Sequence, residues 1–189
     1  TLGDIYVNAG LMDLAADAYM RAIDKAPDGS PDRPLRNAEI LAARAAYRGA
    51  SALLERVREA YGSRIGDKER KRMLKLEARL AAATGVSAEE QARILEEIVR
   101  LDPLDGEALI LLGQHYTRQN NIERASFLFE RAAGMEKFEA EACLRHAQAL
   151  VRHERYDQAV PLLKRAYELN SREDIKRYME QVERVGHLQ

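Results

Sequence analysis

A thiol and an imidazole lie three residues apart in this chain, at Cys143 and His146. On a helix this spacing places both side chains on one face, and a thiol beside a base is the pair that nucleophilic catalysis uses. No third residue that would orient the base, and no oxyanion motif, accompanies them. The pair alone therefore does not predict an active site.

Metal and redox chemistry have little support in the sequence. His115 and His153 do not belong to a His-Glu-x-x-His pattern, so we expect them on the surface or in a groove rather than on a metal. Cys143 is the only cysteine, which excludes an internal disulfide and any multi-cysteine metal site. We expect no metal, no cofactor, no small-molecule substrate and no enzymatic activity.

Two segments could contact phosphate. "TGVSAEE" contains a glycine, but Ser87 followed by Glu90 is the pattern of a helix start and explains the segment fully. The stretch from Glu55 to Lys75 holds eight basic and four acidic residues, with only Tyr61 available to stack on a base. Binding of RNA or an acidic partner through this stretch remains an alternative, and a solvated helix surface is the preferred interpretation.

Composition places the chain among folded proteins, with 46% apolar and 32% charged residues and a net charge of -1. This balance argues against a broad nucleic-acid surface. No apolar run is long enough to cross a membrane, so we expect a soluble protein without a membrane span. The chain begins with Thr1, so a leader cannot be assessed; the compartment is undetermined, with a cytoplasmic location slightly favoured over a periplasmic or secreted one.

Turn residues separate short segments with helical periodicity, and alternating strand patterns are absent, so the sequence predicts an all-α fold. Short turns between such segments predict antiparallel helical hairpins. The C-terminal half also repeats itself at a distance of 34 residues. The matched pairs are Leu109 with Cys143, Leu112 with His146, Gly113 with Ala147, Ala125 with Ala159, Phe129 with Leu163 and Ala132 with Ala166.

This pattern resembles the tetratricopeptide repeat family, whose motif has small residues where Gly113, Ala125 and Ala132 stand. The N-terminus carries the same signature, from Gly3 to Pro27. The resemblance implies a superhelix of helical hairpins, an α solenoid. It also gives Cys143 and His146 the positions of packed leucines one period earlier, which favours a structural role for both.

The family period predicts how a single domain over residues 1–189 is divided. Gly3 and Gly113 are 110 residues apart, or three periods of 34 and eight more. We assign the eight to a loop insertion in "DGSPDRPL", and Ser171 with the apolar stripe from Ile175 to Val185 predicts a closing helix. The predicted units are a partial repeat 1–27, a loop insertion 28–35, a degenerate repeat 38–71, repeats 72–105, 106–139 and 140–170, and a capping helix 172–186.

In this family the first helix of each hairpin lines a concave groove. Carried onto this sequence, those positions predict a partly apolar groove with a basic C-terminal end. Its predicted residues are Met73, Leu76, Leu80, Ile110, Gln114, Arg118, Leu144, Arg145, Gln148 and Arg152.

The resemblance therefore implies a noncatalytic scaffold that binds a helix or peptide of a partner protein in this groove. An alternative is a segment of a longer solenoid that self-associates through its N-terminus or its groove. A further possibility is that neighbouring hairpins or an upstream segment already cover the apolar groove residues. Sequence leaves these interpretations open.

Overall fold

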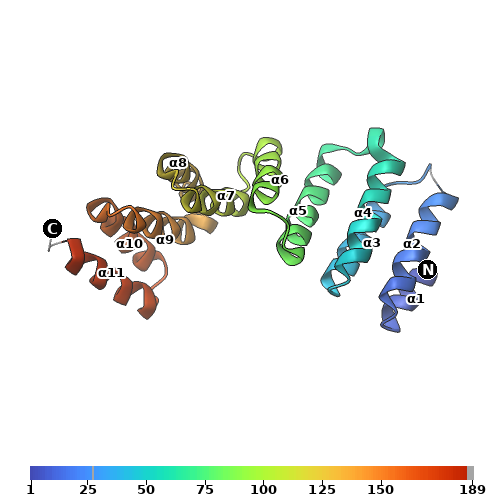
Figure 1. Ribbon diagram of the computed structural model, residues 1–189, viewed down its shortest axis with the longest axis horizontal. Coiled ribbons are helices and arrows are strands. Elements are labelled where there is room, and N and C mark those ends of the chain that lie inside the picture. The colour runs from blue at the N-terminus through green and yellow to red at the C-terminus, as the bar shows by residue number, and fades with distance from the viewer. Residues whose placement is uncertain (27, 187–189) are drawn as a thin grey trace. The chain divides into compact units, whose positions relative to one another are not determined.

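The computed structural model describes residues 1–26 and 28–186. Over these residues the chain forms eleven α-helices and one short 3₁₀ turn, and consecutive helices lie side by side as hairpins (Figure 1). The all-α fold class of sequential hairpins is thus confirmed. The helices are α1 (Leu2–Asn8), α2 (Met12–Lys25), α3 (Asp32–Ala43), α4 (Tyr47–Tyr61), α5 (Asp67–Thr84), α6 (Ala88–Leu101), α7 (Gly106–Arg118), α8 (Ile122–Ala133), α9 (Glu136–Arg152), α10 (Tyr156–Leu169) and α11 (Glu173–Gly186), with the 3₁₀ turn at Gly62–Arg64.

Local hydrogen bonds fix where several helices begin. The Asp105 carboxylate accepts from the Ala108 N–H at 3.1 Å at the start of α7, and Asn121 accepts from the Arg124 N–H at 3.2 Å at the start of α8. Before α6 the Ser87 hydroxyl accepts from the Glu90 N–H at 3.1 Å, as the sequence predicted. These side chains satisfy donors that the first helical turn leaves free.

One left-handed residue follows the first helix of every hairpin. These residues are Gly10, Ala45, Gly85, Asn120 and Glu154, which are 35, 40, 35 and 34 positions apart. Because the left-handed conformation stops a helix and reverses the chain, each residue marks the same point of a repeated unit. The regular spacing gives the register of the five hairpins directly.

This register corrects the predicted position of the insertion. Residues 28–35 were expected to form a loop, but α3 begins at Asp32, and the longest interval lies between Ala45 and Gly85. The extra residues there form the 3₁₀ turn and its flanks between α4 and α5. The second hairpin accordingly spans α3 and α4, earlier than the predicted repeat 38–71. Pro27, the predicted end of the first repeat, is outside the described residues.

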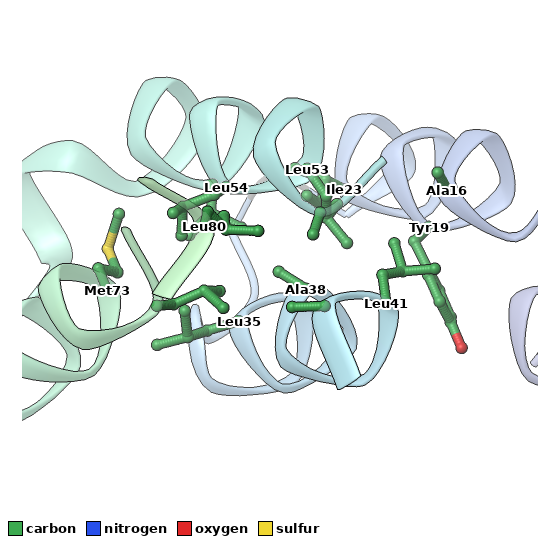
Figure 2. Close-up of a cluster of buried hydrophobic side chains, with 14 of the residues drawn as sticks. Ala16, Tyr19, Ile23, Leu35, Ala38, Leu41, Leu53, Leu54, Met73 and Leu80 are labelled. Carbon is green, nitrogen blue, oxygen red and sulfur yellow. The ribbon is translucent and has the colours of Figure 1, made fainter. Parts of the chain in front are cut away.

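The chain divides into two compact units, residues 1–94 and the part from Leu95 onward. In the first unit α3 contacts α2, α4 and α5, and α2 also contacts α4. Figure 2 shows the core that results, where Tyr19 of α2 lies beside Leu41 of α3, and Ile23 of α2 lies beside Leu53 of α4. That all repeats form a single domain was predicted from the sequence and stays a prediction.

In the second unit each helix from α7 to α11 contacts the next, and α7 also contacts α9. Phe129 on α8 and Leu163 on α10 are fully enclosed in this core. The predicted closing helix is present as α11, which buries Ile175 and Val182. Ser171 does not cap it as expected, because its hydroxyl donates to the Tyr167 carbonyl at 3.3 Å.

Candidate functional site

Three of the predicted groove residues are core residues of the first unit. Met73, Leu76 and Leu80 on α5 are each only 5% exposed. Met73 and Leu80 lie among Leu35 and Leu54, side chains of α3 and α4 (Figure 2). They therefore have no free surface for a partner. The prediction that these three residues line an accessible groove was wrong.

The reason is a one-residue shift in register. Gly85 has a φ of 72° and ends α5, so it matches Asn120 of the next hairpin, whereas the strict period placed Val86 there. A shift of one residue on a helix rotates every side chain by about 100°. The positions equivalent to the predicted groove are then occupied by Arg72, Lys75 and Arg79.

Arg72 is held by acidic residues of the preceding hairpin. Its guanidinium donates to both carboxylate oxygens of Glu39, at 3.0 and 2.9 Å, and to Asp32 at 2.6 Å. These bonds raise the pKa of Arg72 further above its usual value. Such a bidentate pair stabilises α5 against α3 rather than presenting a free cation to a ligand.

Ile110 is also buried, with 4% of its surface exposed. It lies on α7, which packs against both α8 and α9 and therefore buries a wide arc of its surface. Ile110 belongs to that arc. The expected apolar floor of the groove is part of the helix packing.

Six residues of α7 and α9, five of them polar, are exposed or half-buried and form two matching stripes. We call these residues the first-helix face: Leu111, Gln114 and Arg118 on α7, and Arg145, Gln148 and Arg152 on α9. Each residue has its counterpart 34 positions along the chain, and both stripes have the i, i+3, i+7 spacing of one helix side. Leu111, which is exposed, was not among the predicted residues.

The three arginines of this face differ in their partners. Arg145 donates to the Gln148 side chain at 3.3 Å and to Glu141 at 3.5 Å, both on its own helix. Arg118 and Arg152 are exposed and have no ion-pair partner within the described residues. Leu144, another predicted groove residue, is half-buried and packs against the cluster of Cys143, Ala166 and Ile175.

A second concave feature lies between α8 and α10. We call it the second-helix groove; its volume is about 550 Å³ and residues of α9 contribute to its lining. His146 meets Ser126 there, with 2.8 Å between Nε2 and Oγ. Phe127, Glu130 and Leu162 line it as well, and the sequence offered no motif that would have identified it.

Two family models for the tetratricopeptide repeat match the sequence, over residues 144–179 and residues 1–28. These two segments are tetratricopeptide repeats. None of the curated proteins matches it in sequence. The repeat fold is nonetheless shared with solved structures.

The structure of YrrB, described as a TPR protein with an unusual peptide-binding site, is similar with a TM-score of 0.70 and 12% identity, over 95% of this chain and 88% of YrrB. A structure of MamA is similar with a TM-score of 0.68 and 16% identity, over 90% of this chain and 95% of MamA. MamA 41-end from Desulfovibrio magneticus RS-1 has a TM-score of 0.65 and 16% identity, over 91% of this chain and 93% of that one. At these identities the similarity concerns the fold.

In the repeat register, Cys143 and His146 pack as the leucines at the same positions do. Both are buried, and burial raises the pKa of the Cys143 thiol and lowers that of the His146 imidazole. His146 also stacks on Phe129 with ring centroids 5.8 Å apart. A thiol with a raised pKa is a poor nucleophile at neutral pH, so the prediction that this pair has a structural role is supported.

The other histidines differ from expectation in one respect. His115, expected at the surface or in a groove, is buried beside Tyr116, with the two rings edge to face at 5.4 Å. His153 is half-buried, and its Nε2 has no hydrogen-bond partner. In residues 1–26 and 28–186, no cluster of three or more potential ligand side chains could hold a metal ion.

Three arginines of the basic stretch 55–75 are engaged in ion pairs, Arg72 as described above. Arg56 pairs with Asp24 and Glu59, and Arg58 pairs with Glu55 and Glu77. Arg56 and Arg58 therefore bridge α4 to α2 and α5 and are held by carboxylates. No helix in the described part of the chain is long and apolar enough to span a membrane.

Proposed function

We propose that this protein is a noncatalytic scaffold and that the first-helix face binds a peptide or helix of a partner protein. The observation that supports this most is the pair Arg118 and Arg152. They occupy the same repeat position on contacting helices, both are exposed, and both lack an acidic partner in the described residues. Two unpaired cations on adjacent helices form a natural site for carboxylates of a partner.

The rest of the face suits an extended polypeptide. Gln114 and Gln148 provide amide donors and acceptors beside the arginines, and exposed Leu111 provides an apolar contact. Leu144 lies half-buried next to them and adds to the apolar area. A ligand with acidic and apolar residues would thus find complementary groups on both helices.

This proposal replaces the apolar groove that the sequence suggested. Gln114, Arg118, Leu144, Arg145, Gln148 and Arg152 are retained as partner-binding residues, whereas Met73, Leu76, Leu80 and Ile110 stabilise the fold. We also propose that the five hairpins act as one array and need no cofactor. YrrB, which has the same repeat fold, carries a peptide-binding site, and a similar use is proposed for this chain.

A peptide selection tests the proposal. Random dodecapeptides displayed on phage would be selected on the wild-type protein, and the recovered peptides measured against Arg118→Glu combined with Arg152→Glu. We expect acidic, partly apolar peptides with a Kd of about 1 μM, equivalent to about 8 kcal/mol, and a loss of about tenfold or more in the variant.

The matched control is Arg21→Glu combined with Arg184→Glu. Both arginines are exposed, and each donates a hydrogen bond to a carbonyl of its own helix, at 3.3 and 3.2 Å. The control should bind as the wild type does. If both double variants bind the selected peptides equally well, the first-helix face is not the binding site.

Self-association is the alternative function that a specific observation favours. Ile5 on α1 is 64% exposed, whereas the equivalent residue Ile40 is half-buried and the other equivalents, Leu80, His115 and Ala149, are buried. In those hairpins this position packs against other parts of the chain, so the outer side of α1 is an uncovered stacking surface. Light scattering of Ile5→Glu against the wild type distinguishes an oligomer built on this surface from a monomer.

A further inference from the structure

The second-helix groove has the features of a separate ligand site. It lies between α8 and α10, the second helices of their hairpins, whereas Arg118 and Arg152 belong to the first helices. Its volume of about 550 Å³ is large enough for one or two side chains of a ligand. All of its lining residues belong to the unit from Leu95 onward.

The apolar part of the groove is centred on Phe127. This side chain is 59% exposed, although an aromatic ring gains free energy when it is buried. Arg131 covers one face of the ring, 5.7 Å from its centroid, and is itself fixed by a 2.7 Å bond to the Pro103 carbonyl. The ring is therefore steadied on one side and free to receive an apolar side chain on the other, with Leu162 and Pro161 across the groove.

The polar part of the groove carries one uncompensated negative charge. Glu123 is paired with Arg155 at 3.1 Å, so these two charges cancel. A hydrogen bond from its own backbone N–H, and then the bond from Arg155, lower the pKa of Glu123. Glu130 has no ion-pair partner among the described residues, and it stands one helical turn from Phe127. His146 lies nearby on α9 and is engaged with Ser126.

Pro161 and Leu162 of α10 give the opposite wall its apolar part. The negative charge that would attract a cationic ligand comes from Glu130 on α8. Among the lining residues an acidic ligand would meet Glu130 and no unpaired arginine, because Arg155 is paired with Glu123. Arg131, beside Phe127, is outside the lining and donates to the Pro103 carbonyl.

We propose that the second-helix groove binds a segment of a partner protein that presents a bulky apolar side chain next to a lysine or arginine. The apolar side chain packs between Phe127 and Leu162, and the cation pairs with Glu130. Its charge preference is opposite to that of the first-helix face, where Arg118 and Arg152 are proposed to bind carboxylates. One chain would therefore hold two chemically different polypeptide segments.

Charge reversal at Glu130 provides the sharpest test. Random dodecapeptides on phage would be selected separately on the wild type and on Glu130→Lys, and clones sensitive to Phe127→Ala would be sequenced from each. From the wild type these clones should be rich in lysine or arginine beside leucine or an aromatic residue. The Phe127-sensitive clones selected on Glu130→Lys should carry acidic residues instead. Peptides selected on the wild type should bind Glu130→Lys at least about tenfold more weakly.

Two controls separate this site from general effects. Glu136→Lys introduces the same charge change at an exposed residue of α9 that does not line the groove, and it should leave the peptide preference unchanged. Arg118→Glu with Arg152→Glu should leave the Phe127-sensitive peptides bound, even if the proposed function fails. Because Phe127 and Glu130 are exposed, both variants should keep the wild-type circular dichroism spectrum.

Either of two results overturns the proposal. One is that no selected peptide loses affinity in Phe127→Ala. The other is that the sensitive peptides show the same charge preference on the wild type and on Glu130→Lys.

Discussion

At the scale of single residues, each hairpin has one position on its first helix and one on its second helix whose side-chain sizes are complementary. Where the first helix has glycine, the second has an aromatic ring: a Cβ on Gly113 would lie 2.7 Å from Phe129, and one on Gly3 would lie 2.2 Å from Tyr19. Where the first helix has alanine, the second has leucine or isoleucine. The five pairs are Gly3 with Tyr19, Ala38 with Leu54, Ala78 with Ile94, Gly113 with Phe129, and Ala147 with Leu163.

This pairing predicts a compensating double substitution. Gly113→Ala should cost about 1–3 kcal/mol, because the added methyl group meets a ring that is fixed in the core. Phe129→Leu should cost about 1 kcal/mol in lost burial. Together they should cost clearly less than the sum, with a coupling of about 1 kcal/mol, because the pair then matches Ala147 with Leu163.

Urea denaturation of the four proteins of this cycle measures the coupling. Gly62→Ala is the control, because a Cβ there has no atom within 4 Å, and it should change the unfolding free energy little. Strictly additive effects of Gly113→Ala and Phe129→Leu would show that the two positions are independent.

At the scale of helices and turns, the left-handed residues decide where each hairpin reverses. Gly10, Gly85 and Asn120 are residue types that accept this conformation easily. Ala45 and Glu154 are not, and they have φ values of 59°. The backbone of these two residues is strained in the left-handed conformation, and the packing of the flanking helices holds it there.

Ala45→Gly should therefore stabilise the protein, by about 0.5–1 kcal/mol, because it removes the left-handed strain. The same change at Ala52, an exposed residue inside α4, should destabilise it by about 1 kcal/mol. Thermal unfolding followed by circular dichroism compares the two. A lower melting temperature for Ala45→Gly would mean that this turn is not strained.

The sequence predicted the helical fold well but placed one turn wrongly, and Ala45 explains why. In the C-terminal hairpins, helix packing leaves room only for small residues at Gly113 and Ala147. These two residues therefore reveal the repeat period directly in the sequence. The turn at Ala45 has neither glycine nor asparagine, so nothing in "ARAAYR" marks a reversal. The eight extra residues were recognised, and their position was assigned to the proline-rich segment instead.

The candidate site was predictable only where the period is strict. Arg118 and Arg152 lie 34 residues apart in intact hairpins, and their exposure agrees with the expectation. On α5 the one-residue shift at Gly85 moved Leu76 from the expected groove into the core. The second-helix groove combines residues of three helices, and its features depend on packing that no single motif encodes.

At the scale of the whole molecule, the two compact units suggest that stability is local. In repeat folds each hairpin depends mainly on its neighbours, and distant hairpins are only weakly coupled. Leu53 is fully buried in the first unit, and Leu163 is fully buried in the second. Damage to one core should thus spread only a limited distance along the chain.

Leu53→Ala should cost about 2–5 kcal/mol and should reduce amide-exchange protection in α3 and α4 while leaving α9 and α10 protected. Leu163→Ala should give the reverse pattern. Hydrogen exchange followed by mass spectrometry resolves the two regions. Equal loss of protection along the chain in both variants would instead indicate one cooperative unit.

The burial of Cys143 has a practical consequence. It is the only cysteine of the sequence, and it is enclosed between α9, α10 and the closing helix in the cluster with Ala166 and Ile175. Alkylating reagents reach it only when these helices separate, so its reaction rate reports the opening of the C-terminal hairpin. A second cysteine introduced at a surface position would meanwhile react alone, which makes the natural chain ready for site-specific fluorescent labelling.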